Sequence, residues 1–118
     1  MVHYSAPTLD SAFAALSDAT RRGVLARLAR GDASISALAD SFDMTLTGMK
    51  KHVGVLEDAG LVATEKVGRV RTCRLGPRDL GQELAWIEAH RRLWAARLDT
   101  LEQIVADLKE KEQSDDRA

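Results

Sequence analysis

The sequence predicts a mostly α-helical fold with one small β-hairpin, and three patterns along the chain support this. Two short amphipathic helices separated by a tight turn are expected over 34–59. Two β-like runs around a glycine follow over 61–75, which favours a hairpin. A longer helical pattern then covers 77–111. Helix, turn, helix and hairpin in this order are typical of a winged helix-turn-helix, here extended by a long C-terminal helix.

Two helices are expected ahead of this arrangement, where they would form its scaffold. Thr8 is a suitable N-cap for a short helix ending at Leu16, and Asp18 for a longer helix over 19–30. Gly31 follows the second helix and can end it. We therefore expect one domain over 8–112, with flexible termini at 1–7 and 113–118.

The central pair of helices is delimited by residues that favour helix ends. Ser34 and Thr45 can cap the two helices through their hydroxyls, while Asp43 interrupts the helical pattern between them. Gly60 can end the second helix, because glycine enters the left-handed region without steric cost. The side chains expected to face the core are Ile35, Leu38, Ala39 and Phe42 on the first helix and Met49, Val53 and Leu56 on the second.

Positive charge is concentrated in one part of the chain. The whole sequence has a net charge of −1 and a pI near 6.3, which weighs against unselective coating of nucleic acid. The segment 45–75 nevertheless carries six Lys or Arg against three Asp or Glu, whereas the segments on both sides are net negative. A solvated charged face is one explanation. We favour DNA binding as the explanation, because a winged helix contacts DNA through its second helix and its hairpin.

These elements supply the side chains that we expect to contact double-stranded DNA. Short hydroxyls and cations suit base edges and phosphates. For His52 the alternative is a core or capping histidine, but its neighbours Lys50 and Lys51 favour a DNA contact. The expected DNA-binding residues are Ser34, Ser36, Thr45, Thr47, Lys50, Lys51, His52, Lys66, Arg69 and Arg71.

The long helix over 77–111 is expected to be a dimerisation helix. Pro77 suits its first position, and apolar residues from Leu80 to Leu108 repeat in alternating steps of four and three, with Arg91 as an interruption. Packing on the chain's own first helices is the alternative, but a helix this long would overhang so small a domain. The expected interface of a homodimer comprises Leu9, Phe13, Leu84, Ile87, Arg91, Trp94, Leu98, Leu101 and Val105.

Several short motifs together resemble the ArsR family of bacterial winged-helix repressors. They are the L-x-D-x-T-R opening at Leu16, Asp18, Thr20 and Arg21, the helix-turn-helix with His52 and Val55-Leu56, and the run Ala59-Gly60-Leu61-Val62. The likeness extends over 9–75 and is matched by the long helix that follows. It implies a homodimeric, sequence-specific repressor that binds a palindromic operator and releases it on meeting an effector, often a metal ion.

The residues that metal-sensing members of that family use are missing from this sequence. The segment 35–42 contains no cysteine where those members carry a cysteine pair. The last helix offers only His90, with Glu88 on a different face. A structural metal site needs about four ligands. We therefore expect no metal site and no cofactor, and the sequence does not identify an effector.

Two alternatives to this function remain open. One is a winged helix used only for protein contacts, which should carry apolar residues at the hairpin tip and on the second helix. The other is a redox-sensing repressor that uses Cys73, because the cations around that residue can lower a thiol pKa. We expect no enzyme, since neither a phosphate-binding glycine loop nor a nucleophile with a placed base is present. Without a signal peptide or an apolar run of about 18 residues, a cytoplasmic protein that does not enter a membrane is expected.

Overall fold

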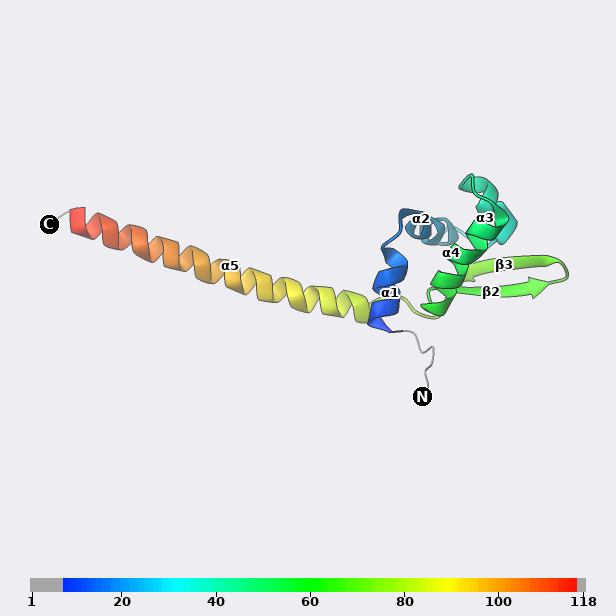
Figure 1. Cartoon of the computed structure of the whole chain (residues 1–118). Helices are drawn as coiled ribbons and strands as arrows, with labels where there is room; N and C mark the ends of the chain where they lie inside the picture. Colours follow the sequence, from blue (N-terminus) through cyan, green and yellow to red (C-terminus); the bar gives the residue numbers. More distant parts are fainter. Residues whose placement is uncertain (1–7, 117–118) are drawn as a thin grey trace. The chain divides into compact units, whose positions relative to one another are not determined.

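The computed structural model describes residues 8–116, and it divides the chain into two compact units that meet between Glu83 and Leu84. The first unit contains α1 (Leu9–Leu16), α2 (Ala19–Leu28), β1 (Ala33–Ser34), α3 (Ile35–Ser41), α4 (Leu46–Asp58), β2 (Val62–Val67) and β3 (Val70–Leu75) (Figure 1). The last helix, α5 (Gly81–Asp116), begins in the first unit and forms all of the second. The predicted class, a mostly helical fold with a small β wing, is confirmed.

Each helix of the first unit up to α4 begins at the capping residue that the sequence predicts. The side chains of Thr8, Asp18, Ser34 and Thr45 each accept a hydrogen bond of 3.0 Å from the backbone N–H three residues on. These bonds satisfy N–H groups that have no partner inside the helix. The caps therefore fix where α1, α2, α3 and α4 start.

The helix-turn-helix is bounded by two similar C-terminal turns. After α3, Asp43 takes a left-handed φ of 53°, and the N–H of Met44 donates to the carbonyl of Ala39 at 2.9 Å. After α4, Gly60 has a φ of 75°, and the N–H of Leu61 donates to Leu56 at 3.0 Å. Both turns are Schellman motifs, which direct the chain away from the helix axis.

The wing is a three-stranded antiparallel sheet in the order β1-β3-β2. β2 and β3 form the predicted hairpin, in which Val67 pairs with Val70 across the turn. β1 was not predicted, because two residues are too few to show a strand pattern. It pairs Ala33 with Cys73, and so places β3 in the centre of the sheet. The wing is therefore attached directly to the residue that caps α3.

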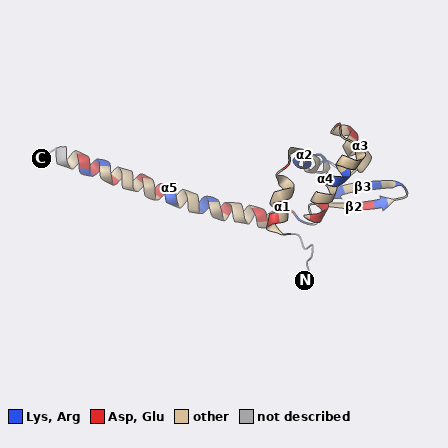
Figure 2. Cartoon of the chain, in the orientation of Figure 1, with Lys and Arg blue, Asp and Glu red and all other residues tan. Residues whose placement is uncertain are grey.

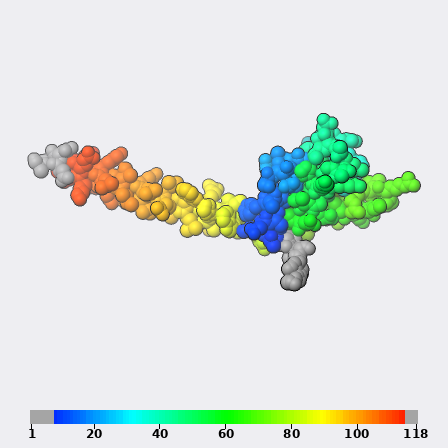
Figure 3. All heavy atoms as spheres, viewed as in Figure 1, coloured from blue at the N-terminus to red at the C-terminus, as the bar shows by residue number. Residues whose placement is uncertain are grey.

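One apolar core joins the helices of the first unit to the base of the sheet. Its largest fully buried side chains include Leu38, Met49 and Leu56 from the helix-turn-helix. α1 contributes Ala15, and Leu16 is partly buried against this core. The outer part of the hairpin extends past the helices, where its side chains are exposed (Figure 3).

The start of the long helix differs from the prediction. Pro77 is not its first residue, and Leu80 is not on its stripe, because α5 begins only at Gly81. Tertiary bonds hold the intervening segment: the N–H of Gly76 donates to Leu61, and that of Arg78 to Gly60. Leu80 takes a positive φ of 67° and packs against the core.

A buried ion pair secures the first turn of α5 within the first unit. The Arg78 guanidinium pairs with the Glu83 carboxylate, which is only 2% exposed. The same guanidinium donates to the carbonyl oxygens of Thr8 at 3.3 Å and Ala59 at 3.1 Å. One side chain thus connects the beginning of α1, the end of α4 and the beginning of α5.

The second unit consists of α5 alone, so its apolar side chains have no core within that unit. Leu84, Ile87, Trp94, Leu98, Leu101 and Val105 are all exposed. Exposed Trp86, Leu93 and Ile104 lie beside this predicted stripe and widen it. The helix continues to Asp116, so 113–116 are helical rather than a loose terminus. The predicted flexible arm at 1–7 lies outside the described residues.

Candidate nucleic-acid interface

α4 presents a polar side, because its apolar residues face the core. Met49, Val53 and Leu56 are buried at three- and four-residue spacing. Thr47, Lys50 and Lys51 lie on the outside and are exposed. Thr45 is also exposed, and although its hydroxyl caps the helix it can still donate its hydrogen to another group. The start of α4 therefore carries hydroxyls, followed by two cations.

The hairpin places three further cations close to its turn. Gly68 and Arg69 form a two-residue connection in which Gly68 has a φ of +63°. A positive φ at the first of two turn residues fits a type II′ turn, which matches the twist of paired strands. Lys66 and Arg71 face each other across the strands next to this turn. The hairpin tip is consequently basic.

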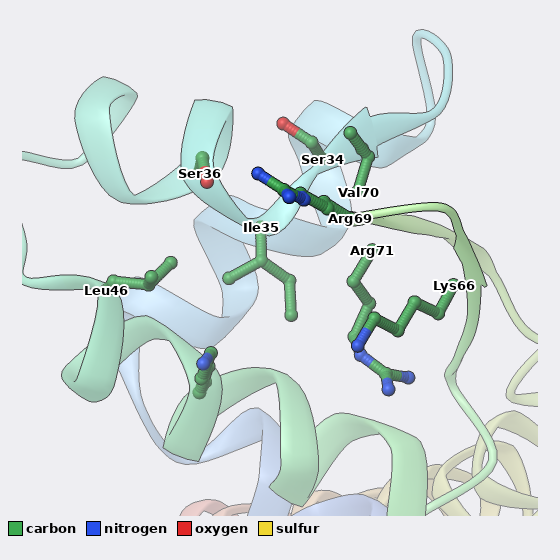
Figure 4. Close-up of a pocket in the computed structure, with 9 residues that line it drawn as sticks. Ser34, Ile35, Ser36, Leu46, Lys66, Arg69, Val70 and Arg71 are labelled. Atoms are coloured by element: carbon green, nitrogen blue, oxygen red, sulfur yellow. The ribbon is translucent and has the colours of Figure 1, made fainter.

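A groove of about 350 Å³ separates these two elements. Its wall residues come from the start of α3, the start of α4 and the hairpin, and Figure 4 shows Lys66, Arg69 and Arg71 reaching from the hairpin toward the helices. Ile35, Leu46 and Val70 supply its apolar surface. No carboxylate lines it. The groove therefore suits an anionic group attached to a less polar one, as phosphate is to deoxyribose in DNA.

Most cations around the groove have no partner in the described part of the protein. Lys50, Lys51, Lys66 and Arg69 make no hydrogen bond or ion pair with another described residue. Arg71 donates to the Thr64 hydroxyl at 3.0 Å, which holds its guanidinium beside β2. Lys and Arg accordingly mark α4 and the hairpin in Figure 2. Their charge remains available for phosphates.

The groove brings together six of the ten residues predicted to bind DNA. They are Ser34, Ser36, Lys50, Lys66, Arg69 and Arg71. Ser34 also caps α3 through its hydroxyl. Thr45, Thr47 and Lys51 lie outside the groove on the exposed side of α4 or at its start. These nine residues form the surface that we call the basic face.

His52 does not line the groove, and its ring contacts α2. Its side chain is only 21% exposed, and its Nδ1 accepts a hydrogen bond of 3.2 Å from Arg21 Nη1. The Asp18 carboxylate lies 3.8 Å from the same nitrogen. The Arg21 N–H that Asp18 accepts lowers the pKa of this carboxyl, and His52 adds to the shift. His52 thus contacts α2 from within the chain, as expected of the structural alternative.

Cys73 does not have the reactive environment that the sequence suggested. It is fully buried, and its position in the central strand covers it on both sides. Burial raises the pKa of its thiol to about 11, and the Glu57 carboxylate adds to this, although Arg71 opposes it. A thiol with a raised pKa is a poor nucleophile. The redox-sensing alternative is therefore not supported.

The apolar surface of the groove was missed at the sequence level. Ile35 was correctly assigned to the core and also lines the groove, whereas Leu46 and Val70 were not assigned to the site. Leu46 and Val70 are 45% and 51% exposed. Leu46 lies three residues before Met49 and continues the helical stripe of α4, so no pattern in the sequence marks it as exposed.

The predicted dimer residues fall in both units. Leu9 and Phe13 are half-buried on α1 in the first unit. The other seven lie on α5 in the second unit, and all are exposed. The second unit therefore carries a long apolar face with no partner element inside that unit.

Within 8–116, no three His, Cys, Asp or Glu side chains are grouped so as to hold a metal ion. None of the described helices combines the length and the apolar character needed to span a bilayer.

Known proteins with similar sequences or structures share this architecture. Residues 16–65 match the family model described as a helix-turn-helix domain. The chain is 35% identical over 80 residues to the HTH-type transcriptional regulator Rv2034 of Mycobacterium tuberculosis, which covers 68% of this chain and 73% of that protein.

Two solved structures extend the comparison. The crystal structure of an ArsR family transcriptional regulator is 46% identical, with a TM-score of 0.68 over 74% of this chain and 96% of that one. The homodimeric winged helix-turn-helix DNA-binding domain of a possible ArsR-family regulator from Mycobacterium bovis is 25% identical. Its TM-score is 0.55 over 75% of this chain and 78% of that one.

The fold and the basic face define a transcriptional regulator with a winged helix-turn-helix DNA-binding fold. The chain belongs to the ArsR family of helix-turn-helix transcriptional regulators. Its relatives are transcriptional regulators.

Proposed function

We propose that this protein is a cytoplasmic repressor that binds a palindromic operator as a homodimer through the basic face. The observation that carries the proposal is the groove between α4 and the hairpin, with unpaired cations on both sides. A bound phosphodiester would meet Lys50, Lys66 and Arg69 without first breaking an ion pair within the protein. Thr47 and Lys51, further out on α4, would face base edges in the major groove.

The exposed face of α5 supports the homodimer. Soluble monomers rarely expose a large contiguous apolar surface, whereas Leu84, Trp94 and Leu101 belong to one that follows α5 for much of its length. A two-fold symmetric dimer presents two copies of the basic face to two half-sites, about 34 Å apart. The homodimeric Mycobacterium bovis relative supports the same assembly for this chain.

Binding to DNA from upstream of the protein's own gene, compared with a random duplex of the same length, tests the proposal. We expect a dissociation constant on the order of 10⁻⁸ M for the operator and much weaker binding to the random duplex. Lys50→Ala or Arg69→Ala should weaken binding to the operator and to the random duplex. Each substitution should also reduce the slope of log affinity against log salt concentration by about one. Thr47→Ala should mainly reduce the preference for the operator.

Arg30→Ala is the matched control, because it removes an exposed cation in the turn after α2 that does not line the groove. It should leave operator affinity within about twofold of the parent, since only contacting cations release counterions. If Arg30→Ala weakens binding as much as Lys50→Ala, net charge rather than the basic face governs affinity. Equal binding of operator and random duplex would remove sequence specificity from the proposal.

One observation favours protein docking by the wing as a second candidate. Val67 and Val70 flank the turn and are 66% and 51% exposed. Exposed apolar residues at the hairpin tip are what a protein-binding winged helix should carry. A Val67→Ser variant separates the two functions, because Val67 does not line the groove: intact operator affinity is expected if the groove and its cations bind DNA.

A further inference from the structure

His90 lies between the only two tryptophans of the chain, on the exposed face of α5. The Trp86 ring stacks on the imidazole with a centroid distance of 5.2 Å and an interplanar angle of 10°. On the other side, the indole N–H of Trp94 donates to His90 Nε2 at 2.7 Å. The spacing of four residues places the three rings in a row along one side of the helix. We call this row the aromatic row.

The hydrogen bond from Trp94 requires an accepting nitrogen on His90. An indole N–H can only donate, so Nε2 must be unprotonated and the imidazole neutral, with its proton on Nδ1. A protonated imidazole has N–H groups at both nitrogens and cannot accept this bond. Adding one proton to His90 therefore breaks the contact between His90 and Trp94.

The surroundings of His90 on α5 contain little to hold a positive charge. The surface hollow beside it is lined by Leu93, Trp94, Arg97 and Leu101 and is mostly apolar. Arg97 is the charged group facing His90 there, and it has the same sign as an imidazolium. No carboxylate lines the hollow. In the second unit no other element packs against α5.

We infer that protonation of His90 controls the association of α5 with a second copy of the chain, so that acid dissociates the dimer. The inference rests on the homodimer proposed above. His90 lies beside the predicted interface residues Trp94 and Leu101, so association would cover it.

The free and the associated helix respond differently to the proton. In the free helix, water can solvate an imidazolium, and the Trp86 ring stacked on it stabilises it by a cation–π contact. In the associated helix the charge would be buried beside Arg97, and the Trp94 N–H would lose its acceptor away from water. The proton therefore binds the free helix more tightly. By linkage, protonation must weaken association of the helices by the same factor by which association weakens proton binding.

Sedimentation of the full chain at about pH 8 and about pH 5.5 tests this inference, because histidine changes charge in that range. We expect the dimer dissociation constant of the parent to rise about tenfold or more in acid. His90→Gln keeps a side-chain acceptor for Trp94 but cannot be protonated, so its dimer should persist at both pH values. His90→Lys carries a permanent charge and should be monomeric already at the higher pH.

Circular dichroism at both pH values shows whether each variant is folded, and tryptophan emission reports directly on the aromatic row. In the parent the emission should change with pH, whereas in His90→Gln it should not. Acid dissociation of His90→Gln equal to that of the parent, or a parent dimer unaffected by acid, would overturn the inference and leave the homodimer standing. A folded parent that is monomeric at both pH values would overturn the homodimer and the inference with it.

Discussion

Arg21 lies where α1, α2 and α4 meet. Its guanidinium donates to the carbonyl oxygens of Ala15 at 2.8 Å and Ala14 at 3.1 Å, and to His52 Nδ1 at 3.2 Å. Carbonyls in the last turn of a helix have no partner inside that helix. Arg21 therefore completes the end of α1 and links it to α4, rather than offering its charge to a phosphate.

Removing this side chain should destabilise the first unit. Arg21→Ala removes the donor to the Ala15 carbonyl and to the half-buried His52, so we expect a loss of about 2–3 kcal/mol in the free energy of unfolding. Urea denaturation measures this loss. Arg30→Ala removes an exposed arginine from the turn after α2 and should change stability by less than about 0.5 kcal/mol. A similar loss in both variants would mean that total charge, not the contacts of Arg21, is responsible.

The stability of the folded protein should depend on pH in the alkaline range because of Cys73. Burial raises the pKa of its thiol from 9.0 to about 11, so the unfolded chain loses this proton at lower pH than the folded chain. Stability linked to the thiol is therefore complete below pH 9.0 and is lost as pH rises toward about 11. Chemical denaturation across this range should show the loss in the parent and not in Cys73→Ala.

The same pKa makes the thiol unreactive in the folded protein. At about pH 8 only about one thiol in a thousand would be ionised, so alkylation by iodoacetamide should be slow until the chain is unfolded. Rapid alkylation of the folded protein would contradict the buried position of Cys73.

The errors at the scale of single residues share a cause. The roles expected for His52 and Cys73 came from their neighbours in sequence, Lys51 and Arg74. Adjacent residues in a helix or strand point in different directions. The groups that surround His52 come instead from α2, and those that surround Cys73 from β1 and β2. Such contacts between distant segments cannot be read from local sequence.

Among the elements, the connection from β3 to α5 depends on a close approach of two backbones. A Cβ added to Gly76 would lie 2.5 Å from the Gly60 carbonyl oxygen and 2.8 Å from the Val62 nitrogen. Neither backbone can move freely, because the Gly76 N–H is bonded to Leu61. Gly76→Ala should therefore lower the free energy of unfolding by more than about 2 kcal/mol, as measured by thermal or urea denaturation.

Gly54→Ala is the matched control for this prediction. Nothing lies within 4 Å of a Cβ added at Gly54, which is inside α4. There alanine should stabilise the protein by about 0.5–1 kcal/mol, because glycine is a poor helix former. If both substitutions destabilise equally, the close packing at Gly76 is not what matters.

Helices that begin at a capping residue or end at a glycine could be predicted from the sequence. Elements whose ends are set by tertiary contacts could not. The caps at Thr8, Asp18, Ser34 and Thr45 and the stop at Gly60 were all correct. The start of α5 was wrong because Arg78 is held by carbonyls from other elements. β1 was missed because it exists only as a partner of β3.

For the whole molecule, assembly should depend on the exposed face of α5. Trp94→Asp combined with Leu98→Asp places two charges on that face, so we expect a monomer by sedimentation with little affinity for the operator. A monomer reaches only one half-site, whereas a dimer binds both. Circular dichroism should show that the helix-turn-helix remains folded, since neither residue belongs to the core of the first unit.

Ala89→Asp combined with Ala96→Asp is the control. Both alanines are exposed on α5, and their positions place them on a different side of the helix from Trp94 and Leu98. The control should remain dimeric and bind the operator like the parent. A folded monomer of the Trp94 and Leu98 variant that keeps parental affinity would contradict the dimer proposal.

The candidate site was predictable in its charges and not in its shape. Lys50, Lys66 and Arg69 stand out because the cations cluster in one segment of the sequence. The groove itself forms where α3, α4 and the hairpin meet, and its apolar wall uses Ile35 and Val70 from segments far apart in the chain. Cavities of this kind depend on the whole fold.

The two residues of β1 have a kinetic consequence for DNA recognition. Ser34 caps α3 and pairs with Thr72 of β3, so one residue belongs to the helix-turn-helix and to the wing at once. The conformational entropy lost in orienting the wing is therefore lost when the chain folds and not when DNA binds. The DNA-binding surface is then ordered before a duplex binds, so association does not require a loop to become ordered first. Pairing of β1 with β3 should therefore leave diffusion and electrostatic attraction as the factors that limit the rate of association with the proposed operator.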